Sequence, residues 1–135
     1  MFFPKTLFIF ALFAHSAIGK HWPPALAEEW IRICKPYRDE CILKTNADPS
    51  EIAKMLSEAY VANNDAIHNY LTCLYEKLHL FEPNGEISEK VVMETATYMT
   101  AVVTKKCVRQ ASLEETRPKR SYILAKCIVD TFAIL

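Results

Sequence analysis

The chain has 135 residues, of which 16 are basic and 16 acidic, so its net charge is zero. A near-neutral chain with interspersed charges excludes an electrostatic surface for nucleic acid or for an anionic membrane. Its length allows one domain with a modest core.

The first residues predict a secretory signal peptide. A short, almost wholly apolar run over residues 6–14 is followed by Ala17 and Gly19, the small residues that precede a cleavage site. This run is too short to span a membrane. We therefore expect a signal peptide at residues 1–19, a single domain at residues 20–135, a secreted, extracellular protein, and no membrane span.

The remaining residues predict consecutive short helices and no strands, which places the chain in the all-α class. Apolar residues recur at helical spacing over residues 24–46, and Pro36 is expected to bend or break this first helix. Asp48 then caps a second helix, which has Pro49 at its first position and extends to about Tyr60.

A third helix is expected from about Asn64 to Leu80, with an apolar stripe facing the core. Its solvent-facing side is expected to consist of Asp65, His68, Thr72 and Glu76. Beyond this helix, Asn84 and Gly85 predict a tight turn with positive φ.

Three further helices complete the expected bundle of about six. Ser88 can cap the fourth helix, which runs to about Met99. The fifth contains Cys107 and ends near Ser112. The sixth runs from about Pro118 to the chain end and is apolar on almost every side, so we expect it to be buried and its last residues to pack inward.

Five cysteines in a small secreted chain predict a disulfide framework with one cysteine left over. They are Cys34, Cys41, Cys73, Cys107 and Cys127. Leaving one out and pairing the other four gives roughly fifteen arrangements. Cys34 and Cys41 are about 10 Å apart along one helix, which is too far for a bond to each other. The other arrangements remain open.

The residues assemble no catalytic or metal-binding constellation. His68 and His79 lie roughly 16 Å apart along one helix, too far apart to share a metal, and we expect both on the surface. The chain has no G-x-S-x-G or H-E-x-x-H motif and no glycine-rich phosphate loop. We therefore predict no catalytic residue, no bound metal, no cofactor and no enzymatic activity.

The cysteine spacing resembles that of the insect odorant-binding proteins, the pheromone-binding and general odorant-binding superfamily. Four cysteines match the first, third, fourth and sixth of the six in that family: Cys41, Cys73, Cys107 and Cys127. The second and fifth positions fall on Asn69 and Pro118. The segments ECILKTNADPSEI and CLYEKLHLFEPNGEIS are also similar to the family, and the resemblance covers essentially all of residues 20–135.

In this family the second and fifth cysteines bond to each other, so their joint absence resembles the four-cysteine Minus-C branch. The resemblance implies the disulfides Cys41–Cys73 and Cys107–Cys127, and a helical bundle that encloses an internal apolar cavity. Cys34 lies outside the pattern. We interpret it as a buried free thiol, with an intermolecular or lineage-specific bridge as the alternative. The missing bridge predicts a looser seam between the third and sixth helices.

The resemblance also implies a function, namely a secreted carrier that solubilises small hydrophobic ligands in olfaction or transport. Odorants, pheromones or other lipophiles are the expected ligands, and an odorant receptor or a second copy of the chain is the expected protein partner. The candidate ligand-binding residues have expected inward or boundary positions. They are Tyr60, Ile67, Tyr70, Leu71, Leu74, Tyr75, Val92, Met99, Val103, Tyr122, Ile123 and Phe132.

Two further hypotheses follow from these residues. His68 and His79 are the candidates for a pH-triggered release of ligand, a property of parts of the family. The alternative function is a secreted non-carrier factor that acts through a protein partner and has a filled core. Saturable binding of an apolar fluorescent probe would separate a carrier from such a factor.

Overall fold

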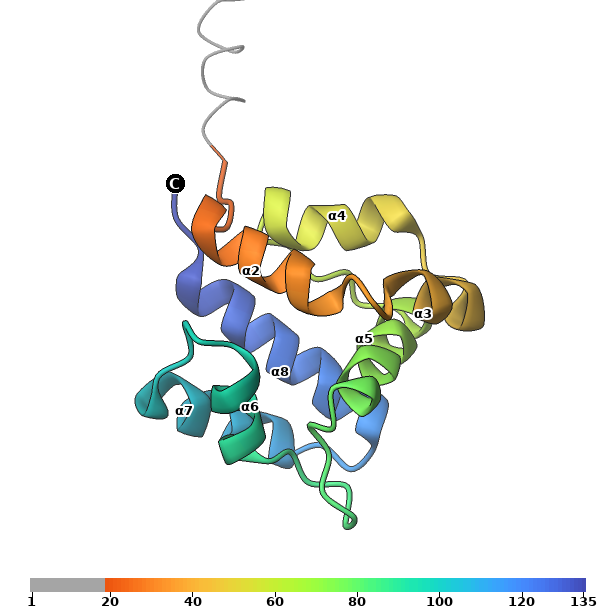
Figure 1. The fold of residues 1–135 in the computed structure, drawn as a ribbon, viewed down its shortest axis with the longest axis vertical. Helices are drawn as coiled ribbons and strands as arrows, with labels where there is room; N and C mark the ends of the chain where they lie inside the picture. The colour runs from red at the N-terminus through yellow and green to blue at the C-terminus, as the bar shows by residue number, and fades with distance from the viewer. Residues whose placement is uncertain (1–18) are drawn as a thin grey trace, which may run out of the picture.

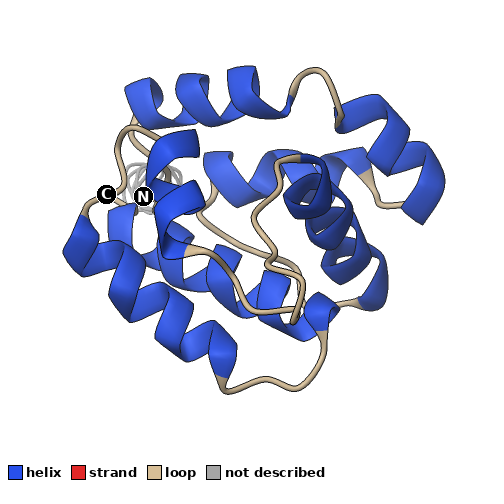
Figure 2. Ribbon diagram, turned by 60° about the horizontal axis from the view of Figure 1, so that its bottom comes forward, coloured by secondary structure: helices blue, strands red, loops and turns tan. Residues whose placement is uncertain are grey.

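The computed structural model describes residues 19–135, which form seven α-helices joined by loops (Figure 1). The helices are α2 (Pro24–Cys34), α3 (Arg38–Thr45), α4 (Pro49–Ser57), α5 (Asp65–Lys77), α6 (Glu89–Thr95), α7 (Ala101–Ser112) and α8 (Arg117–Phe132). The described part contains only helices and loops apart from two isolated β-bridges, so the predicted all-α class is confirmed (Figure 2). The predicted signal peptide, except for Gly19, lies outside the described residues.

Helix α8 lies at the centre of the molecule (Figure 1). α2 and α4 lie on one side of it, and α6 and α7 lie on the other. α5 and α7 make the most extensive contacts with α8, while α3 packs on α5. This central position explains why the sequence of α8 is apolar on almost every side.

α2 and α3 stand in place of the single first helix that the apolar spacing predicts. α2 ends at Cys34, and α3 begins at Arg38 after a turn that contains Pro36. Proline has no amide hydrogen to donate to the preceding helical turn, so the helix breaks there. The predicted break is confirmed, and it accounts for seven helices where about six were expected.

Short polar residues begin α4 and α6 as predicted. The Asp48 carboxylate accepts a hydrogen bond from the Ser50 amide at 2.8 Å, and the Ser88 hydroxyl accepts one from the Val91 amide at 3.2 Å. Gly85, in the loop between α5 and α6, has a φ of 86°, as the predicted turn requires. These local signals therefore set where the elements start.

Both α4 and α6 end earlier than predicted. α4 ends at Ser57 because Ala59 has a left-handed φ of 49°. α6 ends at Thr95, and the amide of Thr97 donates to the Glu29 carboxylate at 2.7 Å instead of continuing the helix. In the case of α6, a contact distant in sequence terminates the helix.

The side of α5 that was predicted to face solvent is partly buried. Asp65 and Glu76 are exposed, but His68 and Thr72 have exposed fractions of only 4% and 9%. The prediction was wrong for these two residues because α8 packs against that side of α5. The Thr72 hydroxyl donates to Ser121 Oγ of α8 at 2.9 Å, so the buried polar groups are paired.

The C-terminal segment leaves the helix and runs along the surface. α8 ends at Phe132, and Ile134 pairs with His21 through two backbone hydrogen bonds of 2.9 Å. Ile134 and Leu135 have exposed fractions of 45% and 79%. The prediction that the last residues pack inward was therefore wrong for these two, because their backbone is held by surface pairing rather than by helix.

Both disulfides implied by the resemblance are present. Cys41–Cys73 joins α3 to α5, and Cys107–Cys127 joins α7 to α8, with Cα–Cα distances of 5.7 and 5.5 Å. Cys34 is free and buried, and burial raises the pKa of its thiol to about 12. The thiol is therefore a small protonated hydrophobe that a second chain does not reach in this conformation.

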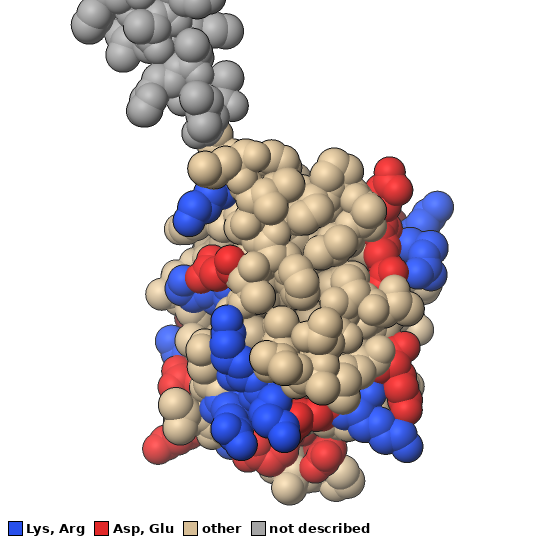
Figure 3. Space-filling model, turned by 90° about the vertical axis from the view of Figure 1, so that its left-hand side faces the viewer, with Lys and Arg blue, Asp and Glu red and all other residues tan. Residues whose placement is uncertain are grey.

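The surface carries charges of both signs. On the face that includes the C-terminus, acidic and basic side chains border a broad uncharged area (Figure 3). In the part of the chain from residue 19 onward, no helix is both long enough and apolar enough to cross a membrane.

Candidate functional site

Two small apolar hollows lie between the helices, and both border Tyr75. The first has a volume of about 40 Å³. Its walls are Trp22, Trp30, Met55, Leu56, Leu71, Tyr75, Tyr98, Ala125, Ile128 and Val129. The second has a volume of about 30 Å³. Its walls are Trp30, Tyr75, Leu80, Val92, Thr95, Ala96, Tyr98, Met99, Leu124 and Ile128.

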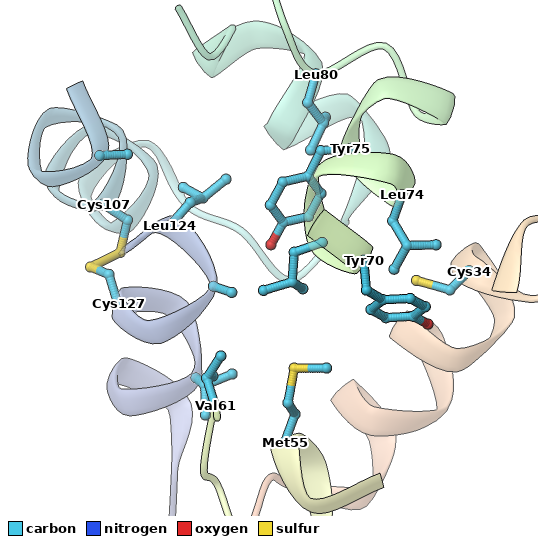
Figure 4. Packing of buried hydrophobic residues seen from close by; sticks show 14 of the residues in the cluster. Cys34, Met55, Val61, Tyr70, Leu74, Tyr75, Leu80, Cys107, Leu124 and Cys127 are labelled. Carbon is cyan, nitrogen blue, oxygen red and sulfur yellow. A yellow bond between two sulfur atoms is a disulfide. The ribbon is translucent and has the colours of Figure 1, made fainter. Parts of the chain in front are cut away.

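The two hollows are neighbours, because four residues belong to both walls. These are Trp30, Tyr75, Tyr98 and Ile128. In Figure 4 the Tyr75 side chain extends from α5 toward α8, and its hydroxyl oxygen lies in the space beside Leu124. We therefore treat the two hollows as one candidate site with Tyr75 at its middle.

An aromatic cluster forms one end of the first hollow. Trp22 packs edge-on against Tyr98 and Phe132, with ring centroids 5.4 and 6.0 Å apart. The indole Nε1 of Trp22 donates to the Val129 carbonyl at 3.1 Å. These contacts hold the Trp22 ring in place, and they bring the C-terminal end of α8 to the edge of the site.

Glu29 holds the segment that carries Tyr98. Its carboxylate accepts hydrogen bonds from the Thr97 amide at 2.7 Å and from the Thr97 hydroxyl at 2.5 Å. The bond from the Thr97 hydroxyl is the main cause that lowers the pKa of Glu29. α2 and the segment after α6 are thus joined beside the hollows.

Within residues 19–135, no charged side chain lines either hollow. Burial raises the pKa of Tyr75 and Tyr98 well above the ordinary value, so both phenols stay neutral. The same part of the chain contains no group of three or more side chains that could hold a metal ion. The walls therefore suit an uncharged, largely apolar guest rather than a charged substrate.

The hollows are small in this conformation. A water molecule needs about 10–15 Å³ on this measure, so the two hollows together have room for about five to seven waters. A guest with more heavy atoms than this fits only if wall side chains move. Met55 and Leu56 are the flexible aliphatic members of the first wall.

Four of the candidate ligand-binding residues line the hollows. Leu71 and Tyr75 border the first hollow, and Tyr75, Val92 and Met99 border the second. α5 supplies the first two of these residues, and Leu71 belongs to its predicted apolar stripe, so that stripe does reach the site. Val92 comes from α6, and Met99 comes from the segment after it.

The other candidates do not line the hollows. Three are core residues of α5, namely Ile67, Tyr70 and Leu74. Four are partly buried and pack against the core, namely Val103, Tyr122, Ile123 and Phe132. Tyr60 has an exposed fraction of 57%, because the chain leaves α4 at Ser57 and turns outward before it.

Sequence reasoning missed most of the wall that α2 and α8 supply. Trp22 precedes α2 and Trp30 lies within it, so helical spacing could not show that both line the same hollow. α8 is apolar on almost every side, so its spacing could not show that Ile128 faces a hollow. Tyr98 lies outside any helix, in a segment fixed by Glu29, and no periodicity places it.

The seam between α5 and α8 contains a chain of buried hydroxyl groups. Thr72 Oγ1 lies 2.9 Å from both the His68 carbonyl and Ser121 Oγ, and Ser121 Oγ lies 2.9 Å from the Arg117 carbonyl. Two hydroxyl protons serve these three contacts. When one of these protons bridges the two helices, the other satisfies a backbone carbonyl.

His68 lies at the same seam, whereas His79 does not. The Nε2 atom of His68 lies 2.9 Å from the Asn63 amide oxygen, and its ring packs on Tyr122 with centroids 4.5 Å apart. Burial lowers the pKa of His68, and the positive charge of Lys119 adds to this effect. His79 is exposed beyond the end of α5, so only His68 belongs to a contact between helices.

The comparison with known proteins agrees with this geometry. Residues 25–131, most of the chain, match the PBP/GOBP family. No curated protein matches the sequence. The chain therefore belongs to the PBP/GOBP family, the insect odorant-binding proteins, whose members are non-enzymatic proteins that bind hydrophobic odorants and pheromones and are typically secreted.

Proposed function

We propose that this chain is a secreted carrier that binds and solubilises a small hydrophobic molecule in the two hollows beside Tyr75. The observation that carries the proposal is the uncharged, aromatic-rich wall at the meeting point of α2, α5 and α8. Helical bundles hold ligands in such interior sites. The proposal includes a signal peptide at residues 1–19, a mature domain at residues 20–135, and odorants, pheromones or other lipophiles as ligands.

Family membership supports a further assignment to the Minus-C branch. Asn69 and Pro118 occupy the positions at which the second and fifth cysteines are expected from the spacing. The two disulfides of the described chain leave the α5–α8 seam without a covalent bond. We propose that a seam without a disulfide lets the site adjust to guests of different size.

An open groove between α2 and α4 is the proposed entrance. It has a volume of about 580 Å³ and shares Trp22 and Leu56 with the first hollow. Trp22 is held by its hydrogen bond to Val129, which leaves Leu56, in the last turn of α4, as the side chain free to swing. In this mechanism the guest enters past Leu56 while water leaves, and the Phe132 end of α8 closes the adjacent side.

The energetics favour weak, broad binding. A guest that buries roughly 300 Å² of apolar surface gains about 7–8 kcal/mol, and the loss of translational freedom subtracts several kcal/mol. Because micromolar binding corresponds to about 8 kcal/mol, a guest without a polar anchor binds no tighter than micromolar. The cost of opening the small hollows weakens binding further.

Titration with the apolar probe 1-N-phenylnaphthylamine tests the proposal. We expect saturable, one-to-one binding that small lipophiles displace. Leu71→Phe, which fills the first hollow, should weaken binding, whereas Leu43→Phe should not, because Leu43 has an exposed fraction of 87%. Thermal unfolding of both variants checks that the fold is kept.

The small volume of the hollows favours a second candidate function. A secreted non-carrier factor that acts through a protein partner needs a filled core and no guest. Absence of saturable probe binding by the folded protein would support this factor and refute the carrier. Equal weakening by Leu71→Phe and Leu43→Phe would refute the assignment of the site.

A further inference from the structure

Tyr75 is a buried residue whose hydroxyl has no hydrogen-bond partner in the described chain. The residue has an exposed fraction of 4%, and its oxygen points from α5 into the interior (Figure 4). Among residues 19–135, none of the side-chain hydrogen bonds involves this hydroxyl, including those of α5 and α8 around it. It differs from the Thr104 hydroxyl, which also lacks a partner but is fully enclosed, because Tyr75 borders both hollows. An acceptor can therefore reach Tyr75 from inside the site.

Tyr70 provides an internal comparison on the same helix. It is as deeply buried as Tyr75, with an exposed fraction of 1%, but it extends toward Cys34 and lines neither hollow (Figure 4). The two tyrosines are therefore similar in burial and differ in access to the site.

The walls restrict the chemistry of a partner for the Tyr75 hydroxyl. No lysine, arginine or histidine lines either hollow in the described chain. A carboxylate there would lose its hydration without gaining a cation, which is costly. A pure hydrocarbon would leave the buried phenol unpaired. A neutral oxygen acceptor avoids both costs.

The position of Tyr75 also restricts where that oxygen lies in the guest. Tyr75 lines both hollows, and each is otherwise apolar apart from a few hydroxyl and indole groups. A guest that occupies both hollows passes Tyr75, so an acceptor that Tyr75 reaches in such a guest has apolar groups on both sides. An acceptor at the end of a chain would place the oxygen at Tyr75 only by leaving one hollow empty.

We propose that the site selects a neutral guest of the ketone or ester class with its oxygen near the middle, and that the Tyr75 hydroxyl donates to this oxygen. The inference rests on the proposed carrier function and adds the chemical class of the guest. Tyr75 is then a specificity-determining residue, and Tyr98, the other phenol shared by the hollows, packs beside the guest.

A set of guests of similar size tests the proposal. Heptan-4-one has a central carbonyl, 4-methylideneheptane has a methylene in its place, and heptan-2-one has the carbonyl near one end. Binding of these volatile guests is measured by their loss from the headspace above the protein. Binding of heptanoate is measured by displacement of 1-N-phenylnaphthylamine. Each guest is tested with the wild type, Tyr75→Phe and Tyr70→Phe.

We expect heptan-4-one to bind the wild type more tightly than heptan-2-one and heptanoate. Tyr75→Phe should weaken the binding of heptan-4-one by about 2- to 12-fold, the range of one net hydrogen bond. It should leave the binding of 4-methylideneheptane unchanged. Tyr70→Phe should change neither. Equal effects of Tyr75→Phe on the ketone and its methylene analogue, or tightest binding of heptanoate, would overturn the inference and leave the carrier function intact.

Infrared spectroscopy provides a readout that needs no variant at Tyr75. The carbonyl stretch of bound heptan-4-one should shift to lower frequency than in an apolar solvent, because the carbonyl accepts a hydrogen bond. An unshifted band in the bound state would overturn the inference. Absence of saturable binding by every guest and by the probe would overturn the carrier function itself, and the inference with it.

Discussion

Two buried threonines differ in whether their hydroxyl groups have partners. Thr104, on α7, is fully buried and its hydroxyl makes no hydrogen bond within the described residues. Thr72, on α5, donates to Ser121 Oγ at 2.9 Å. A buried polar group without a partner destabilises the folded state, whereas a paired one contributes modestly. At the residue scale, the same side chain thus has opposite energetic roles.

Substitution by valine should separate these roles. Thr104→Val removes the unpaired hydroxyl and should raise the free energy of unfolding by about 1 kcal/mol, whereas Thr72→Val should lower it by about 1 kcal/mol. Urea unfolding followed by circular dichroism measures both. A loss of stability in Thr104→Val would show that this hydroxyl has a partner.

His68 makes stability depend on pH. Burial and Lys119 lower its pKa in the folded state, and Asp65 opposes them, while the unfolded value is about 6.5. The unfolded chain therefore binds the proton more readily, and the free energy of unfolding should fall as the pH drops below about 6.5. His68→Gln should flatten this dependence, and His79→Gln, at an exposed site, should not. A wild-type profile that does not change between pH 7.5 and 5.5 would contradict the prediction.

At the scale of elements, α4 is both a wall of the site and its proposed entrance. Leu56 belongs to the first hollow and to the outer groove, whereas Ile52, one turn earlier, packs on the core and lines neither. Leu56→Ala should raise the association rate constant of 1-N-phenylnaphthylamine by up to about tenfold. The smaller side chain no longer blocks the path from the groove into the first hollow.

Stopped-flow fluorescence measures this rate. Ile52→Ala is the matched control, since it shortens a partly buried side chain of α4 without opening the path. If both variants bind the probe at the wild-type rate, the guest does not enter between α2 and α4.

The elements themselves could largely be predicted from the sequence, because their signals are local. Apolar spacing, the caps at Asp48 and Ser88 and the break at Pro36 act within a few residues. The end of α6 could not be predicted, since it depends on Glu29, which is distant in sequence.

The residues that line the site could be predicted only in part, because contacts between residues distant in sequence also decide which side chains face the hollows. Leu71 lies on the predicted apolar stripe of α5, whereas packing decides which faces of α2 and α8 line the site.

At the scale of the whole molecule, the two disulfides join helices in pairs. One joins α3 to α5 and the other joins α7 to α8. With loops of 32 and 20 residues, each contributes about 3–4 kcal/mol. The seam between α5 and α8 is held without a covalent bond, by Thr72, Ser121 and a 3.9 Å ion pair between Glu76 and Arg117. Because α5 and α8 both supply walls of the site, we expect movement at this seam to enlarge the hollows.

A third disulfide at the seam should remove that freedom. The side-chain oxygens of Thr72 and Ser121 are 2.9 Å apart across a separation of 49 residues, so Thr72→Cys/Ser121→Cys should form a bond, detectable as a mass loss. It should raise the free energy of unfolding by about 2–4 kcal/mol over the single variants and slow amide exchange in residues 66–74 and 118–128.

The same bond should weaken the binding of guests too large for the closed hollows, because α5 and α8 can no longer separate. Unchanged binding of such guests by the bonded protein would show that the site opens elsewhere, with Leu56 and α4 the remaining route.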